Sequence, residues 1–221
     1  MARPPIYPFV ATALIMCALP LRSQEPHVSD TLSVEALVQQ LRNIPSALPG
    51  GVTSNAVTPP TEILRSRIYN RLLALHPDSV RALAQGFQDP DIEFRRNVAL
   101  ALGVLGGGWW SFDGARRKVD IGAALPTLIA ALNDTDSLVR AWAAQDIGDI
   151  GPDAAVAVPA LVTLLASGDE AARNSACIAL RGIGPGARPA LPALRIALSD
   201  PSADVREFAE RAIKSIESQS L

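Results

Sequence analysis

The chain has 221 residues with 20 basic and 22 acidic side chains, so its formal net charge is −2. A slightly acidic chain is not expected to bind nucleic acid, because proteins that do so normally carry a basic excess. It holds only two cysteines and two histidines, which leaves little material for thiol or metal chemistry.

The N-terminus has the pattern of a secretory signal. Residues 1–3 are basic at Arg3, an apolar run extends from Phe9 to Leu21, and a polar exit follows at Arg22–Gln24. The run is too short to span a bilayer comfortably. We therefore expect residues 1–23 to be a signal peptide and the mature chain to be periplasmic or extracellular. The alternative is that the segment stays uncleaved as a membrane anchor.

Cleavage after Ser23 would remove two arginines and change the net charge from −2 to −4. It would also remove Cys17, so Cys177 would remain alone and no intrachain disulfide could form. Leu14–Cys17 resembles a bacterial lipoprotein box, with Met16 where that box has Gly or Ala. Membrane contact is expected only if the segment is uncleaved or lipidated.

Residues 24–60 are expected to form a loose tail, a short helix over Thr31–Arg42 and a linker. The linker prediction rests on the Pro, Gly, Ser and Thr that fill Asn43–Pro60. Residues 61–77 follow with apolar side chains at helical spacing. We interpret this segment as a helix that caps the first full repeat, because the ends of repeat arrays are atypical.

A unit of 33 residues recurs through the rest of the chain. Each copy holds two apolar stripes at helical spacing, which in one copy comprise Leu125, Leu128 and Leu132, and then Val139, Ala143, Ile147 and Ile150. Neither helix can bury its stripe alone, so neighbouring pairs must stack. The sequence predicts an all-α solenoid of stacked antiparallel helix pairs. Its repeats lie at about 78–106, 121–151, 154–184 and 187–217.

Polar residues recur between and around the stripes. Asp134 and Asp136 supply turn and helix-start chemistry, whereas Gly148 and Gly151 are expected to end the second helix. One arginine per repeat opens each second helix, at Arg95, Arg140, Arg173 and Arg206, and we call this series the arginine ladder. We expect these arginines to brace successive turns through the acids Asp89, Asp134 and Asp200. Asp146 replaces alanine at its position in the other repeats. We expect it to be half-buried and either paired or altered in its pKa, and we favour pairing with a nearby arginine.

These residues resemble the HEAT-repeat family, in particular its short bacterial variety. The family pattern is a proline in the first helix, an aspartate eight residues later and Val-Arg at the start of the second helix. Here Pro126, Asp134 and Val139–Arg140 match it, and Ser167 departs from it in the next copy. The resemblance covers roughly residues 78–217. It implies a right-handed stack with the second helices on the concave side, and it implies no reaction.

The period is broken once, because 45 residues separate Asp89 from Asp134 where later copies need 33. The added residues fall within 107–120, which contains two of the three tryptophans. Insertions in solenoids form loops on one face, often the binding face. The candidate partner-binding residues of this insertion are Trp109, Trp110, Phe112, Arg116, Arg117 and Lys118. The alternative is that the tryptophans cover a hydrophobic edge and the basic run is merely solvated.

Leu100 and Ile178 form a second candidate surface, because they are apolar at second-helix positions where a solvated face is expected. The alternative is that they are isolated apolar surface residues, which are common.

Enzyme signatures are absent from the sequence: we identify no catalytic residue, no metal ligand set and no cofactor motif. We therefore expect an exported, monomeric scaffold that binds another protein. One alternative is a ligand-binding or lyase-like enzyme similar to the HEAT-repeat bilin lyases, with a flat ligand stacked on Trp109, Trp110 and Trp142. Another is a passive spacer in an envelope assembly.

Overall fold

A computed structural model describes residues 32–44, 60–107 and 119–218, and it contains no strand within these ranges. The helices are α2 (Val34–Leu41), α3 (Pro60–Ala74), α4 (Asp78–Gln85), α5 (Ile92–Gly106), α6 (Leu125–Ala131), α7 (Ser137–Ile150), α8 (Val158–Ser167), α9 (Glu170–Ile183), α10 (Leu191–Ala197) and α11 (Ala203–Ser218). Short 3-10 segments join them at η2 (Gly86–Gln88), η3 (Gly122–Ala124), η4 (Gly151–Ala157) and η5 (Gly184–Ala190).

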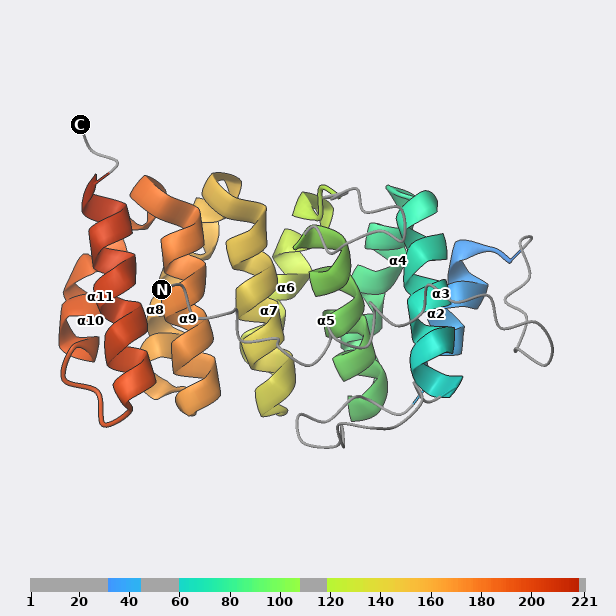
Figure 1. The fold of residues 1–221 in the computed structure, drawn as a ribbon, viewed down its shortest axis with the longest axis horizontal. Coiled ribbons are helices and arrows are strands. Elements are labelled where there is room, and N and C mark those ends of the chain that lie inside the picture. Colours follow the sequence, from blue (N-terminus) through green and yellow to red (C-terminus); the bar gives the residue numbers. More distant parts are fainter. Residues whose placement is uncertain (1–31, 45–59, 108–118, 219–221) are drawn as a thin grey trace.

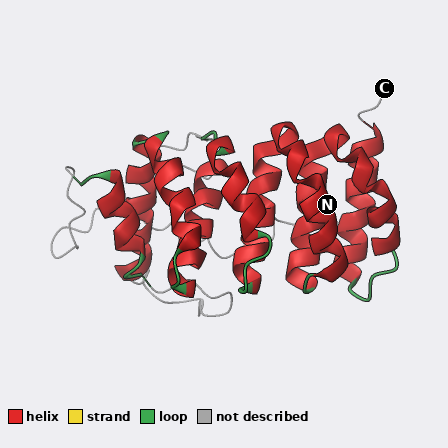
Figure 2. Ribbon diagram, turned by 180° about the vertical axis from the view of Figure 1, so that it is seen from behind, coloured by secondary structure: helices red, strands yellow, loops and turns green. Residues whose placement is uncertain are grey.

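The helices pair and the pairs stack into an elongated array, as predicted. Figure 1 shows α5, α7, α9 and α11 side by side, with α6, α8 and α10 behind them. Figure 2 shows the same array from behind, where the helices are joined by short turns. The first helix of each repeat contacts the second, and each second helix contacts the second helix of the next repeat. This is an α-solenoid.

The two apolar stripes of each repeat meet in a continuous core. Leu128 of α6 is fully buried, as are Val139, Ala143 and Ile147 of α7. Burial of a leucine or isoleucine side chain stabilises a fold by about 1.5–3 kcal/mol. Every repeat contributes such residues, so the free energy of folding is distributed along the whole array.

Local sequence fixes where each second helix begins. The side chains of Asp136 and Asp169 accept hydrogen bonds from backbone N–H groups in the first turns of α7 and α9. Such N-caps satisfy donors that have no partner within the helix. The first helices start instead with a proline, as at Pro126, where the missing N–H is of no consequence.

Glycines act at two kinds of position. Gly151 and Gly184 have φ of 83° and 69° and end α7 and α9, in a region that favours glycine. Gly148 was predicted to end α7, and this is wrong, because α7 continues to Ile150. A Cβ on Gly148 would lie 2.9 Å from Cα of Ala179 in α9. Gly148 therefore allows two neighbouring second helices to approach closely.

The N-terminal end is built from two helices. The sequence assigned the capping role to the helix at residues 61–77, whereas α2 packs against α3, α4 and α5 together. Asn97 of α5 donates from Nδ2 to the carbonyl oxygens of Leu41 and Ile44, at 2.9 and 2.6 Å. These bonds satisfy acceptors at the end of α2 and fix that helix to the first full repeat.

One stretch, Ser137–Ser167, is long and apolar enough to cross a membrane by length and composition alone. In the fold it comprises α7, η4 and α8, which belong to two successive repeats. The positive φ of Gly151 changes the chain direction within it. Its apolar side chains contribute to the core of the solenoid.

Candidate interaction surface

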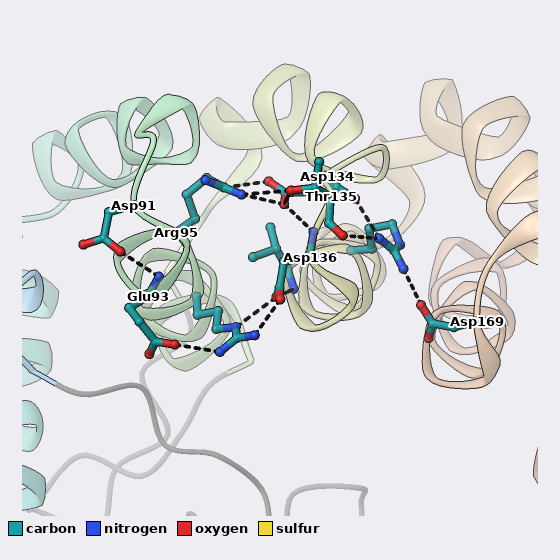
Figure 3. A network of polar contacts seen from close by, with 10 residues as sticks. Asp91, Glu93, Arg95, Asp134, Thr135, Asp136 and Asp169 are labelled. Atoms are coloured by element: carbon teal, nitrogen blue, oxygen red, sulfur yellow. Dashed lines mark hydrogen bonds and ion pairs between the residues drawn. The ribbon is translucent and has the colours of Figure 1, made fainter.

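Arginines fix the second helices at one edge of the stack. Arg95 donates from Nε and Nη2 to the two carboxylate oxygens of Asp134, at 2.7 and 2.9 Å (Figure 3). Its Nη1 also donates to the carbonyl oxygen of Asp89, at 2.8 Å. One guanidinium thus joins the turn of its own repeat to the turn of the next. Such two-pronged, charge-assisted contacts are strong and directional.

The same contact recurs along the array. Arg173 donates to both carboxylate oxygens of Asp200, at 2.8 and 2.9 Å, and its Nη1 donates to the carbonyl oxygen of Gly168. Arg140 cannot repeat the pattern in full, because Ser167 occupies the aspartate position of the next repeat. It binds the N-cap carboxylate of Asp169 instead.

The bracing role predicted for these arginines is confirmed at Asp134 and Asp200, whereas Arg95 binds Asp89 through its backbone carbonyl oxygen and not through its carboxylate. The Asp89 carboxylate accepts from Arg42, at the end of α2, and not from Arg95. Arg42 also stacks on Phe94 at 4.3 Å from the ring centroid. The N-terminal helix pair is therefore tied into the same series of ion pairs.

These contacts shift the acidity of the aspartates. A hydrogen bond from Arg173 holds the pKa of Asp200 below its ordinary value, and one from Arg96 does the same to the pKa of Asp136. Both carboxylates remain charged at neutral pH. The rigid edge that results sets the spacing of α5, α7 and α9.

Four equivalent positions on each second helix form a second stripe, which we call the second-helix face. Its members occupy equivalent positions in the repeats: Glu93, Asn97, Leu100 and Val104 in α5; Leu138, Trp142, Gln145 and Asp149 in α7; Ala171, Ser175, Ile178 and Gly182 in α9; Asp204, Phe208, Arg211 and Ser215 in α11. Spacings of four and three residues place each set on one side of its helix.

Apolar side chains recur on the second-helix face. Trp142, Ile178 and Phe208 are each half-buried, on three successive second helices. Trp142 and Phe208 are equivalent, since two periods of 33 residues separate them. Leu100 is only 8% exposed, so of the two predicted residues Ile178 offers more surface. Phe208 was not identified from the sequence, although the 66-residue spacing from Trp142 was a usable signal.

The other predicted site residues cannot be placed on this surface. Trp109, Trp110, Phe112, Arg116, Arg117 and Lys118 lie outside the described residues. Their role as a binding loop stays a prediction. The described chain on either side is α5, which ends at Gly106, and Val119, whose N–H donates to the carbonyl oxygen of Leu105 at 3.0 Å. The insertion therefore leaves and rejoins the stack at the end of α5.

Asp146 was predicted to be half-buried and either paired with an arginine or altered in its pKa; the arginine pairing is wrong, whereas the altered pKa is confirmed. The residue is 2% exposed, and its Oδ2 has no hydrogen-bond partner. Burial, and secondarily the charge of Asp149, raise the pKa of Asp146 well above its ordinary value. The arginines do not pair with Asp146 because their contacts hold them at the N-terminal ends of the second helices. Arg95 binds the Asp134 carboxylate, and Arg140 binds the Asp134 carbonyl oxygen.

The described residues offer no reactive chemistry that we can assign. No group of three or more His, Cys, Asp or Glu within the described ranges is arranged to hold a metal ion. Cys177 is fully buried, as its alanine counterparts predicted, and burial raises the pKa of its thiol to about 12. A thiol of this kind is not a nucleophile at neutral pH.

Two cavities lie on the side of the first helices. One, of about 140 Å³, is bounded by α6 and α8 and includes Asn133 and Thr163. The other, of about 360 Å³, lies between Phe87 and α6. Neither contains a residue of the second-helix face, so the two surfaces are separate.

A family model described as HEAT repeats matches residues 123–214. These residues cover α6 to α11 with the arginine ladder and the buried stripes of three repeats. This part of the chain is therefore similar to HEAT repeats. No match is found among the curated proteins.

Solved structures with the same fold include natural and designed repeat proteins. An engineered protein is 26% identical, with a TM-score of 0.59, and the match covers 84% of this chain and 79% of that one. The complex of CpcE and CpcF of phycocyanin lyase from Nostoc sp. PCC7120 is 23% identical, with a TM-score of 0.57, over 90% of this chain and 71% of that one. A designed armadillo repeat protein in complex with the peptide (KR)4 is 17% identical, with a TM-score of 0.56, over 83% and 81%. The likeness at these low identities is one of fold.

Proposed function

We propose that this HEAT-repeat chain is a scaffold that binds a segment of another protein along its second-helix face. The observation that carries the proposal is the row of half-buried apolar side chains, Trp142, Ile178 and Phe208, on three adjacent second helices. Aromatic side chains supply large contact areas at low entropic cost and are enriched among the residues that dominate interface energies.

Two further features support a protein segment as the ligand. The charged members of the face are mostly acidic, with Glu93, Asp149 and Asp204 against the single base Arg211, so the face does not favour a nucleic acid or another polyanion. The designed armadillo neighbour holds a peptide, which is compatible with peptide binding by this class of fold. The ligand we expect is a segment with two or three apolar side chains spaced to match the repeats.

We propose that the chain itself catalyses no reaction. The buried thiol of Cys177 and the lack of a metal-ligand cluster within the described ranges are consistent with a binding role. The phycocyanin lyase neighbour is 23% identical, which supports a common fold and does not by itself favour a lyase activity here.

The test is a peptide-library selection against the chain, followed by affinity measurements with matched variants. Trp142→Ala and Phe208→Ala should each weaken a selected peptide by about 30-fold or more, which corresponds to the ~2 kcal/mol of an interface hot spot. Ile196→Ala is the control, since Ile196 is 77% exposed on the first helix α10. Peptides that bind all three variants equally would exclude the second-helix face. Circular dichroism must show that each variant keeps its helices.

The insertion at residues 107–120 is proposed as a second contact for the same partner. Replacement of residues 108–118 by a short Gly-Pro join should leave the helices intact and weaken the selected peptides further if the loop takes part. Unchanged affinities would remove the loop from the proposal.

Export is proposed from the N-terminal pattern alone. The basic start, the apolar run Phe9–Leu21 and the polar exit support cleavage near Ser23. Intact-mass measurement of the chain recovered from its native envelope fraction tests this directly. A mature N-terminus near Gln24 supports cleavage, whereas the full-length mass would support an anchor, and an added lipid mass on Cys17 would support lipidation.

A further inference from the structure

We call the contact between two successive second helices a seam. The seam between α5 and α7 differs from the seam between α7 and α9. At α7–α9 the backbones meet through small residues, with Gly148 against Ala179. At α5–α7 the corresponding position holds Asp146, whose counterparts Ala101, Ala179 and Ala212 are alanines with no exposed surface. A single carboxyl group therefore occupies a site that the repeat otherwise fills with a methyl group.

The carboxyl of Asp146 points across the seam towards α5. A Cβ added to Gly103 would lie 2.9 Å from Oδ1 of Asp146, so the carboxyl fits because residue 103 has no side chain. The aspartate is 2% exposed, and its Oδ2 has no hydrogen-bond partner. An unpartnered, desolvated carboxylate at such a position costs several kcal/mol if it is charged.

No cation compensates this group within the described ranges. On α5, Arg95 and Arg96 are held by Asp134 and Asp136 at the opposite end of the helices.

The other elements packed against α7 supply no positive charge that acts on Asp146. The helix α6 contains no charged residue, and η4 contributes only Asp153. On α9, Arg173 is bound to Asp200, and Arg181 is exposed. Among the described residues, the charge that acts on Asp146 is that of Asp149, three residues later on α7, and it opposes ionisation.

We propose that Asp146 makes the α5–α7 seam a proton-controlled joint: the neutral acid lets the two helices pack, and loss of its proton loosens them. The joint lies beneath the second-helix face, so its state sets the spacing between the first full repeat and the rest of the array. The joint itself needs no partner, so its test is independent of the proposed binding function.

The direction of the pH effect follows from linkage. Burial and Asp149 raise the pKa of Asp146, so the folded chain holds this proton more tightly than the unfolded chain, whose aspartates titrate near pH 3.9. The resulting stability is present in full below about pH 3.9 and is lost as the pH rises through the folded-state pKa. Over that window, each pH unit lowers the folding equilibrium constant roughly tenfold relative to a chain that lacks the acid.

The experiment compares the full chain with Asp146→Ala, which restores the residue found at this position in the other repeats. Urea unfolding is measured from pH 4 to pH 9. The ratio of the two folding constants should change in favour of the variant by roughly tenfold per pH unit and then level off at the folded-state pKa. Equal pH profiles for the two chains would overturn the proposal.

A second measurement separates a joint from a uniform loss of stability. Hydrogen exchange of α5 and α7 amides, corrected for the intrinsic pH dependence, should accelerate as the pH rises from about 3.9 to the folded-state pKa and then level off, while α11 amides should not change. Asp146→Ala should remove the acceleration. Equal acceleration in all helices, or a carboxyl carbon of Asp146 that titrates near pH 3.9 by nuclear magnetic resonance, would overturn the proposal.

Discussion

Replacement of Arg95 by alanine tests whether the arginine ladder holds the repeats together. The substitution removes both bonds to the Asp134 carboxylate and the bond to the Asp89 carbonyl oxygen. Side chains of this pair are each 10% exposed, so the remaining carboxylate would be left largely desolvated. Asp134 would keep only the backbone N–H of Asp136, at 2.8 Å, and its contact with Thr135.

The magnitude follows from the degree of burial. Removal of one partner of a fully buried ion pair costs about 3–5 kcal/mol. The pair here is slightly exposed and Asp134 retains a backbone donor, so we expect about 2–3 kcal/mol in the free energy of unfolding. For a domain of this size the melting temperature should fall by roughly 4–12 °C.

The assay is urea and thermal unfolding followed by circular dichroism. Arg195→Ala is the matched control, because Arg195 pairs with Glu217 at 3.0 Å while both side chains are at least half exposed. Exposed pairs contribute little to stability. If Arg95→Ala and Arg195→Ala lose the same stability, the ladder is not what joins the repeats. Arg95→Lys should recover only part of the loss, because an ammonium group cannot form the two-pronged contact.

Three further predictions follow from the same structure. Gly148→Ala should destabilise the chain by about 1–3 kcal/mol, since the new Cβ would meet the Ala179 backbone; a gain of ~1 kcal/mol in urea unfolding, as helix propensity alone would give, would contradict the close approach of α7 and α9. Because Arg173 lowers the pKa of Asp200, this pair stabilises the chain above about pH 3.9 and the benefit is lost as the pH falls through the folded-state pKa. The stability deficit of Arg173→Ala should therefore shrink on acidification from pH 5 to pH 2, and a constant deficit in urea titrations would refute this. Cys177 should resist disulfide reagents in the native chain and react after unfolding in urea, as measured in a Cys17→Ser background; rapid native labelling would show that the thiol is accessible.

The sequence predicted the array because a fixed period repeats the same backbone contacts. The stripes, the N-cap acids and the arginines were identifiable, since each recurs at one position of a 33-residue unit. The partner of Arg140 was not identifiable in this way, because Ser167 replaced the expected aspartate and the guanidinium turned to Asp169. An arginine has several donors and binds the acidic side chain that lies near enough in the fold. The spacing of residues along the sequence does not give that distance.

The close approach of α7 and α9 was also not predicted from the sequence. Gly148 was read as a helix end because glycine is common there, whereas its role is to admit the backbone of α9. Sequence periodicity reports which side of a helix is apolar, but not how near the neighbouring helix lies. The candidate site is less predictable than the fold for a related reason. Trp142 and Phe208 pack against the core and keep part of their surface exposed, but the repeat does not dictate which side chain stands at their position, since Asn97 and Ser175 occupy it in the other repeats.

Positions that the repeat does not constrain are therefore where function can be sought. The core requires alanine-like residues at the position of Asp146, and an aspartate there lowers the packing quality that the other repeats keep. The second-helix face carries different side chains in different repeats, and Trp142, Ile178 and Phe208 place partly exposed apolar surface on three successive helices. The aspartate in the core and the half-buried apolar side chains of the second-helix face both occur on α7, at Asp146 and Trp142. Asp146 is buried on α7, four residues after Trp142. Changes at the contact between α5 and α7 should therefore first affect the binding of a ligand near Trp142.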